Sequence, residues 1–142
     1  MIHDVSTDLE EPPQFIALRE VRLACPNGVE YSGPRILSQS NLEPNFFALP
    51  CGTIFQAALT IANTMQWKVA VAVEAEGRIE ATATTRLLRF KDDVVIRIRP
   101  AVNGAKLDIR SASRLGSSDF GTNARRMHAF LRELNKLLKI NT

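Results

Sequence analysis

The sequence is poor in the residues that mark several protein classes. It has two cysteines, two histidines, one tryptophan and one tyrosine among 142 residues. Two cysteines set no disulfide framework, so Cys25 and Cys51 are expected to be free thiols, and a single disulfide stays open only for an oxidising compartment. His3 and His128 give no zinc-binding spacing. No metal, cofactor or catalytic residue is predicted.

No long hydrophobic run is present either. A membrane-spanning helix needs roughly 20 apolar residues, and a secretory leader needs a basic segment followed by an apolar one. As written, the chain is expected to be cytoplasmic with no membrane span; a missing leader would make it an exported protein instead. The sequence sets no oligomeric state.

The excess of one sign of charge over the other is also small. Eighteen Lys and Arg against fifteen Asp and Glu leave a net charge of +3. This mild excess permits contact with anions but does not predict nucleic acid, which would also require aromatic side chains for base stacking on a basic face. Nucleic acid is therefore disfavoured as a partner.

Proline divides the chain into two parts. Six of the seven prolines lie within the first 50 residues, whose opening stretch is acidic. Residues 1–49 are predicted to form an irregular arm packed on an α+β domain of residues 50–142. The chain is long enough for one core without a metal or a disulfide.

Two segments of the domain have helical periodicity. Apolar side chains from Ile54 to Met65 fall on one stripe, with Thr53 as a plausible N-cap. A second stripe runs from Phe120 to Leu138, and Asp119 is its predicted N-cap. Both helices are expected to cover the same face of a sheet.

Four strands are predicted between these helices, in two hairpins. Residues 67–73 and 79–85 alternate, and a three-residue loop of residues 75–77 puts Gly77 in a left-handed conformation. Asn103-Gly104 is the strongest short hairpin signal and predicts the second turn. The expected fold is a two-layer α+β domain, with a four-stranded antiparallel sheet and the order α-β-β-β-β-α.

These turns predict which side chains meet on the face away from the helices. The Asn103-Gly104 turn sets Arg97 opposite Arg110, and a turn at residues 91–92 sets Arg86 opposite Arg97. The same registers predict two ordinary ion pairs, Arg99–Asp108 and Asp93–Arg114. Three adjacent guanidinium groups repel one another unless solvent, an acidic segment or an anion separates them.

Three interpretations of this arginine row stay open. The side chains splay into water, the acidic arm or a partner's acidic segment lies across them, or they bind an anion such as phosphate or carboxylate. The start of the last helix could extend an anion site, although simple capping explains Asp119 equally well. The predicted ligand-binding set is Arg86, Arg97, Arg110, Arg114, Asp119, Asn123 and Arg125.

Two segments carry a family resemblance. "RIEATATTRLLRFKDDVVIRIRP" and "LDIRSASRLGSSDFGTNARRMHAFL" closely resemble bacterial and plastid proteins of the domain-of-unknown-function family DUF1499. The shared pattern is an Ile-Glu-Ala strand, a Phe-x-Asp-Asp turn, an Arg-Ser-x-Ser-Arg strand, and Ser-Asp-x-Gly-x-Asn-x-Arg-Arg. It covers roughly residues 50 to 138. "ACPNGVEYSG" resembles a Pro-Asn-Cys-Val-Ser-Ser segment of the family, with Gly28 in place of the cysteine. The resemblance implies the fold and the site but no activity.

Two function classes follow from these observations. The preferred one is a non-enzymatic binding or assembly module whose arginine-rich face receives an anionic ligand or an acidic protein segment. The alternative is a small hydrolase or transferase using the Ser/Asp/Arg cluster, with Ser111 or Ser113 as nucleophile and His128 as base. Alternation turns both serines toward the helices, so a closed environment around them favours the first class and a cleft shared with His128 the second. Asp92 and Asp93 are expected to serve the turn and ion pairs rather than a cation.

Overall fold

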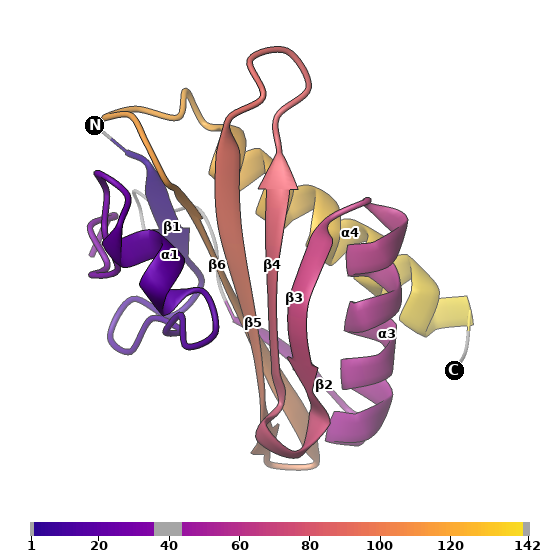
Figure 1. Cartoon of the computed structure of the whole chain (residues 1–142). Helices are drawn as coiled ribbons and strands as arrows, with labels where there is room; N and C mark the ends of the chain where they lie inside the picture. The colour runs from indigo at the N-terminus through magenta and orange to yellow at the C-terminus, as the bar shows by residue number, and fades with distance from the viewer. Residues whose placement is uncertain (1, 36–43, 141–142) are drawn as a thin grey trace.

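The structure, a computed structural model, describes residues 2–35 and 44–140 (Figure 1). The strands are β1 (Asp4–Ser6), β2 (Asn45–Phe47), β3 (Lys68–Val73), β4 (Arg78–Thr84), β5 (Lys91–Ala101) and β6 (Gly104–Ser113). The helices are α1 (Arg19–Leu23), α3 (Cys51–Thr64) and α4 (Thr122–Ile140), with a 3-10 turn η1 (Glu74–Glu76). No helix in the described ranges is long and apolar enough to cross a bilayer.

The predicted α+β class with an antiparallel sheet is confirmed, but the strand count was wrong. The sheet has six strands in the order β1-β6-β5-β4-β3, with β2 also paired to β6. β1 pairs with residues 110–112 and β2 with residues 105–107, so the two lie one after the other along the same edge of β6. Both added strands come from the first 49 residues. Segments of three residues are too short to show a strand period, which is why the sequence did not indicate them.

The helices α3 and α4 pack on one face of the sheet. Their stripes meet the inward side chains of β4, β5 and β6 in a core that includes Ile54, Met127, Phe130, Ile79, Ile96, Leu107 and Ile109. Trp67 stacks on Phe130 with ring centroids 5.4 Å apart. α3 begins at Cys51 with an extended Pro50 as its N-cap, three residues before the predicted N-cap Thr53, and no side chain caps it.

The β5–β6 hairpin forms as predicted but in another register. Ala101 pairs with Gly104, so the central residues of the turn are Val102 and Asn103 rather than Asn103 and Gly104. Only Asn103 has a positive φ, 61°, as at the second central position of a type II turn. Gly104 lies inside β6, where a Cβ would come within 1.8 Å of the Phe47 carbonyl oxygen. The offset is even, so every side chain keeps its predicted face.

The other two connections also differ in length. The β3–β4 loop has four residues, 74–77, although Gly77 is left-handed as expected, with φ 62°. Thr84 pairs with Lys91, so residues 85–90 form a loop in place of two longer strands. Thr85 closes this loop because its amide donates to the Phe90 carbonyl oxygen and its hydroxyl accepts the Phe90 amide, both at 2.8 Å.

The predicted row of three arginines is therefore wrong. Arg97 lies opposite Asp108 on β6, and Arg110 lies opposite Val95 on β5. Arg86 lies beyond the end of β4, in the loop of residues 85–90. Arg99 lies opposite Lys106 rather than Asp108. The physical cause is the placement of the turns, because a strand pair is set by the residues at its turn.

Candidate functional site

The sheet face that carries the arginines is covered by the N-terminal part of the chain. Phe15 and Leu18 form a second apolar cluster with Val95 and Ala112 of that face. Figure 1 shows α1 on the side of the sheet away from α3. Glu80 is completely buried beneath α1, and its carboxylate accepts the amides of residues 16, 17 and 18 at 2.8–3.1 Å.

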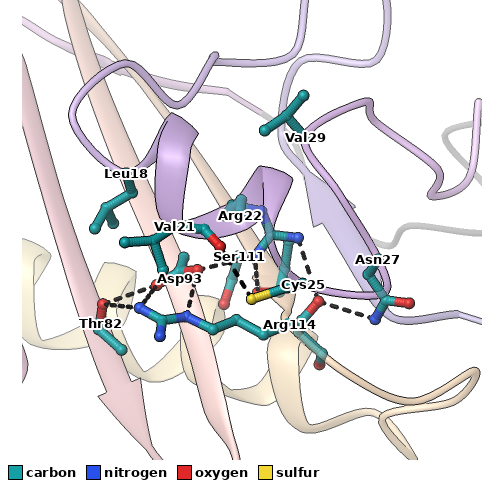
Figure 2. Close-up of polar contacts among 12 residues, drawn as sticks. Leu18, Val21, Arg22, Cys25, Asn27, Val29, Thr82, Asp93, Ser111 and Arg114 are labelled. Carbon is teal, nitrogen blue, oxygen red and sulfur yellow. Dashed lines mark hydrogen bonds and ion pairs between the residues drawn. The ribbon is translucent and has the colours of Figure 1, made fainter.

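Asp93 joins α1 to the sheet (Figure 2). Its carboxylate accepts Arg22 Nη1 at 3.0 Å, both Arg114 Nε and Nη2 at 2.9 Å, and the Thr82 hydroxyl at 2.7 Å. The hydrogen bond to Asp93 raises the pKa of Arg114 above its usual value. Arg22 also donates to the carbonyl oxygens of Gly28, Ala112 and Ser113. The Asp93–Arg114 contact expected from the sequence is present, but diagonally, since Asp93 pairs with Ala112.

Arg110 is almost fully buried and is satisfied by the arm. Its Nε and Nη2 donate to the two oxygens of Asp4 at 3.0 and 2.9 Å, a bidentate pair. Nη1 donates to the Pro13 carbonyl oxygen, and Nη2 also donates to that of Val29. The guanidinium lies over the rings of Phe15 and Tyr31.

Arg97 is held by a second acidic residue of the arm. Its Nη2 lies 2.9 Å from Asp8 Oδ2 and 3.4 Å from Asp108 Oδ2, and its Nη1 donates to the Glu11 carbonyl oxygen. Burial opposes ionisation of Asp8, but the Glu11 and Glu10 amides together with Lys106 and Arg97 bring the pKa of this carboxyl below its usual value. Carboxylates of the chain itself therefore neutralise Arg97, Arg110 and Arg114.

Asp119 and Asn123 form a buried network at the start of α4. Asp119 accepts the amides of Gly121 and Asn123, as a capping residue does. Asn123 Oδ1 accepts the Ser111 hydroxyl at 2.6 Å, and its Nδ2 donates to Ser113 and Asp119. Asn123 is completely buried. Both residues are thus engaged in holding β6 against α4.

The two serines are buried, and Ser113 also lines an apolar pocket of about 250 Å3 together with Asp92. Ser111 is completely buried and Ser113 is 6% exposed, and both hydroxyls contact Asn123. His128 lies on the exposed side of α4. Arg126 pairs with Asp92 at 2.8 Å and donates to Ser111, which completes a structural network.

A groove at one end of the sheet gathers four arginines, of which Arg126 alone has an acidic partner among the described residues. It has a volume of about 710 Å3, and its lining includes Arg86, Arg89, Arg125, Arg126, Trp67 and Thr122. Arg125 donates to the Phe120 carbonyl oxygen at 2.9 Å and to the Thr122 hydroxyl at 3.3 Å. Within the described part of the chain, no carboxylate pairs with Arg86, Arg89 or Arg125. No Asp or Glu lines the groove.

Comparison with known families agrees with the resemblance of the motifs. The family model described as "Protein of unknown function (DUF1499)" matches residues 4–134, which include most of the arm. The chain belongs to the DUF1499 family. No curated protein matches the chain significantly.

Many of the polar residues through which the chain resembles DUF1499 make the buried networks, whereas Phe90 lines the apolar pocket and Arg125 the groove. Glu80, Asp93, Arg110, Ser111, Ser113, Arg114, Asp119, Asn123 and Arg126 all take part in these networks. At the position of the DUF1499 cysteine, Gly28 has φ 64° and its carbonyl oxygen accepts Arg22 Nε at 2.8 Å. Cys25 and Cys51 are both free. The motif therefore records how this fold is held together.

Sequence reasoning missed several residues of the sheet face covered by the arm and of the arginine groove. Arg22 has no distinguishing signal, because it is one of two arginines on a five-residue helix. Arg89 was not selected, because the predicted turn lay at residues 91–92 rather than in the loop of residues 85–90. Asp4 and Asp8 did carry a signal, since an acidic start and an arginine-rich face are complementary in charge.

Proposed function

We propose that the protein is a non-enzymatic binding module that accepts an anionic ligand in the groove lined by Arg86, Arg89 and Arg125. Arginine presents a planar set of donors that suits phosphate and carboxylate groups. Of the ligand-binding set expected from the sequence, Arg86 and Arg125 remain in this proposal. Arg97, Arg110, Arg114, Asp119 and Asn123 are given structural roles instead.

One contrast carries this proposal. The arginines on the arm-covered face are neutralised by carboxylates at 2.9–3.4 Å. Three arginines in the groove have no such partner in the described ranges, although like charges brought together repel. An anion that bridges them would remove the repulsion and add charge-assisted hydrogen bonds.

Isothermal titration of the full chain with inorganic pyrophosphate at constant ionic strength tests the proposal. Arg86→Ala and Arg125→Ala should each weaken binding by about tenfold or more, since a hydrogen bond to a charged group contributes about 1.5–3 kcal/mol. Arg132→Ala on the exposed side of α4 is the matched control and should leave the affinity unchanged.

A titration with hexaglutamate under the same conditions tests an acidic protein segment as the ligand. Binding of hexaglutamate but not pyrophosphate, with the same dependence on Arg86, would assign the groove to such a segment. Absence of binding by either probe, or an equal effect of Arg132→Ala, contradicts the proposal.

A further inference from the structure

Five large apolar side chains are exposed at the end of the molecule that holds the groove. They come from the β4–β5 loop and from the segment that joins β6 to α4. Leu87 is 89% exposed, Leu88 66%, Phe90 47%, Leu115 57% and Phe120 86%. All five line one apolar pocket of about 250 Å3. Figure 1 shows the β4–β5 loop projecting beyond the end of the sheet.

Two arginines lie among the apolar side chains of the β4–β5 loop. The β4–β5 loop reads Arg86-Leu87-Leu88-Arg89-Phe90, so each apolar group adjoins an unneutralised guanidinium. Arg125 holds the other loop, because it donates to the Phe120 carbonyl oxygen at 2.9 Å. The apolar pocket and the arginine groove also share Thr122 as a lining residue. The two features therefore form one continuous surface.

The backbone keeps Phe120 on the outside at some cost. Phe120 has φ 53°, a left-handed conformation that is uncommon for a bulky residue. The next residue, Gly121, leaves room for Arg125, whose Nη1 would lie 2.7 Å from a Cβ at that position. The loop thus presents the Phe120 ring to solvent, while the hydrogen bond from Arg125 to the Phe120 carbonyl oxygen holds its backbone.

The two carboxylates that line this surface in the described ranges are both bonded within the chain, and one of them, Asp92, is neutralised by an arginine. Asp92 and Asp119 line the apolar pocket. Arg126 pairs with Asp92 at 2.8 Å, and the amides of Gly121 and Asn123 bond to Asp119. The net character of the surface is apolar at the loop tips and positive beside them.

We propose that these two loops dock the protein on an anionic membrane surface. The side chains of Leu87, Leu88 and Phe120 enter the headgroup region. The guanidinium groups of Arg86, Arg89 and Arg125 bind lipid phosphates beside them. An apolar edge flanked by basic side chains is the chemistry that holds a peripheral protein in the interface of an anionic bilayer. This inference rests on the proposed function and identifies the anion as a lipid headgroup.

The geometry favours a bilayer over the other occupants. A helical peptide lays a whole apolar face into a long groove, whereas the apolar pocket here holds only about 250 Å3 and its most exposed groups project from loop tips. A second copy of this chain would bring another set of unneutralised arginines against the first, which is unfavourable. Protruding apolar tips beside positive charge instead match a soft surface that carries phosphates.

Co-sedimentation of the full chain with vesicles tests the inference. We expect the chain to bind phosphatidylcholine vesicles that contain phosphatidylglycerol, and this binding should weaken as salt is added. Binding to vesicles of phosphatidylcholine alone should be weak. The double variant Leu87→Ser/Leu88→Ser should weaken binding by about tenfold or more. Arg86→Ala and Arg89→Ala should each weaken it about fivefold. These side chains are exposed, so the thermal midpoint should not change.

Val102→Ser is the matched control for the leucines. Val102 is 92% exposed in the β5–β6 turn, at the opposite end of the sheet, and its change should leave vesicle binding unaltered. Absence of binding to anionic vesicles, or an effect of Val102→Ser equal to that of the leucine variant, overturns the inference.

The two proposals fail in different ways. Arginine-dependent binding of pyrophosphate without vesicle binding would overturn the membrane assignment and leave the anion-binding module in place. Leucine-dependent binding of hexaglutamate without vesicle binding would replace the membrane by a protein segment. If the arginine substitutions changed neither pyrophosphate nor vesicle binding, both proposals would be wrong.

Discussion

Arg22 Nη1 lies 3.0 Å from Asp93 Oδ2, and the two side chains are 1% and 0% exposed. One comes from the short helix of the N-terminal arm and the other from the middle of the sheet. An ion pair removed from water leaves an uncompensated charge if either partner is lost. This pair therefore makes the attachment of the arm sensitive to single substitutions on the sheet.

Asp93→Asn should destabilise the fold by about 3–5 kcal/mol, because it leaves Arg22 buried without a charged partner. Urea unfolding followed by circular dichroism measures the change. Glu133→Gln is the control, since Glu133 is half-exposed and pairs only with Lys136 on the surface of α4, and it should cost less than about 1 kcal/mol. Equal losses for the two variants would show that the buried pair contributes no more than a surface one.

Tyr31 should titrate at unusually high pH. Burial raises the pKa of Tyr31 to about 12, and the charge of Asp4 adds to the effect. The neutral phenol is thus favoured by the fold, and its contribution to stability is present below about pH 10 and lost as pH rises through about 12. Tyr31 is the only tyrosine, so the tyrosinate absorbance reports it alone.

The measurement compares the folded chain with the chain in urea. The midpoints should be about 12 and about 10 respectively, with circular dichroism recorded at each pH to show that the fold persists. A folded-state midpoint near 10 would contradict the burial of this phenol against Arg110.

Asp8 should contribute stability that fades in acid. Its folded-state pKa is lowered from 3.8, so the carboxylate stabilises the fold above that value and the contribution is lost as pH falls through the lower folded pKa. Asp8→Asn should therefore be less stable than the parent chain at neutral pH and equally stable well below pH 3.8. Urea unfolding at both pH values checks this. A stability difference that does not change with pH would remove Asp8 as the partner of Arg97.

Gly104→Ala should displace β2 from the sheet edge. The added Cβ would meet backbone atoms of Phe47 and Ala48 at 1.8–3.0 Å, and backbone cannot rotate away as a side chain can. A loss of about 1–3 kcal/mol is expected, with faster hydrogen exchange in β2. Gly52→Ala is the control, since it lies in α3 with nearest contact 3.9 Å, and should be neutral or slightly stabilising.

The regular elements could be predicted because their patterns repeat. Apolar side chains recur along α3 and α4 at helical spacing, and apolar and polar residues alternate along most of β6 and from Ile96 to Arg99 of β5. Register was harder, because it depends on single residues at the turns. The Asn-Gly pair suggested the wrong turn, since Gly104 is needed for the close approach of Phe47 and Asn103 alone supplies the positive φ.

The candidate site was only partly predictable. Arg86 was selected because the predicted register set it opposite Arg97, and that register is wrong. Arg125 was selected as part of the start of the last helix, and the meeting of the two depends on a loop that Thr85 closes. The predicted turn at residues 91–92 would have placed Leu87 and Leu88 in a paired strand, whereas they lie exposed in the loop of residues 85–90. No local pattern distinguishes an arginine that will be buried, such as Arg22, from one that stays in solvent.

The pairing of β1 with β6 also determines when β1 can join the sheet while the chain is being synthesised. Asp4 contacts Arg110 across 106 residues of sequence, so β1 can pair with β6 only after those intervening residues have been synthesised. At about 5–20 residues per second, that delay is about 5–20 seconds. During that interval Asp4 lacks the Arg110 guanidinium that neutralises it in the folded chain, and the β1 edge of the sheet forms after the rest.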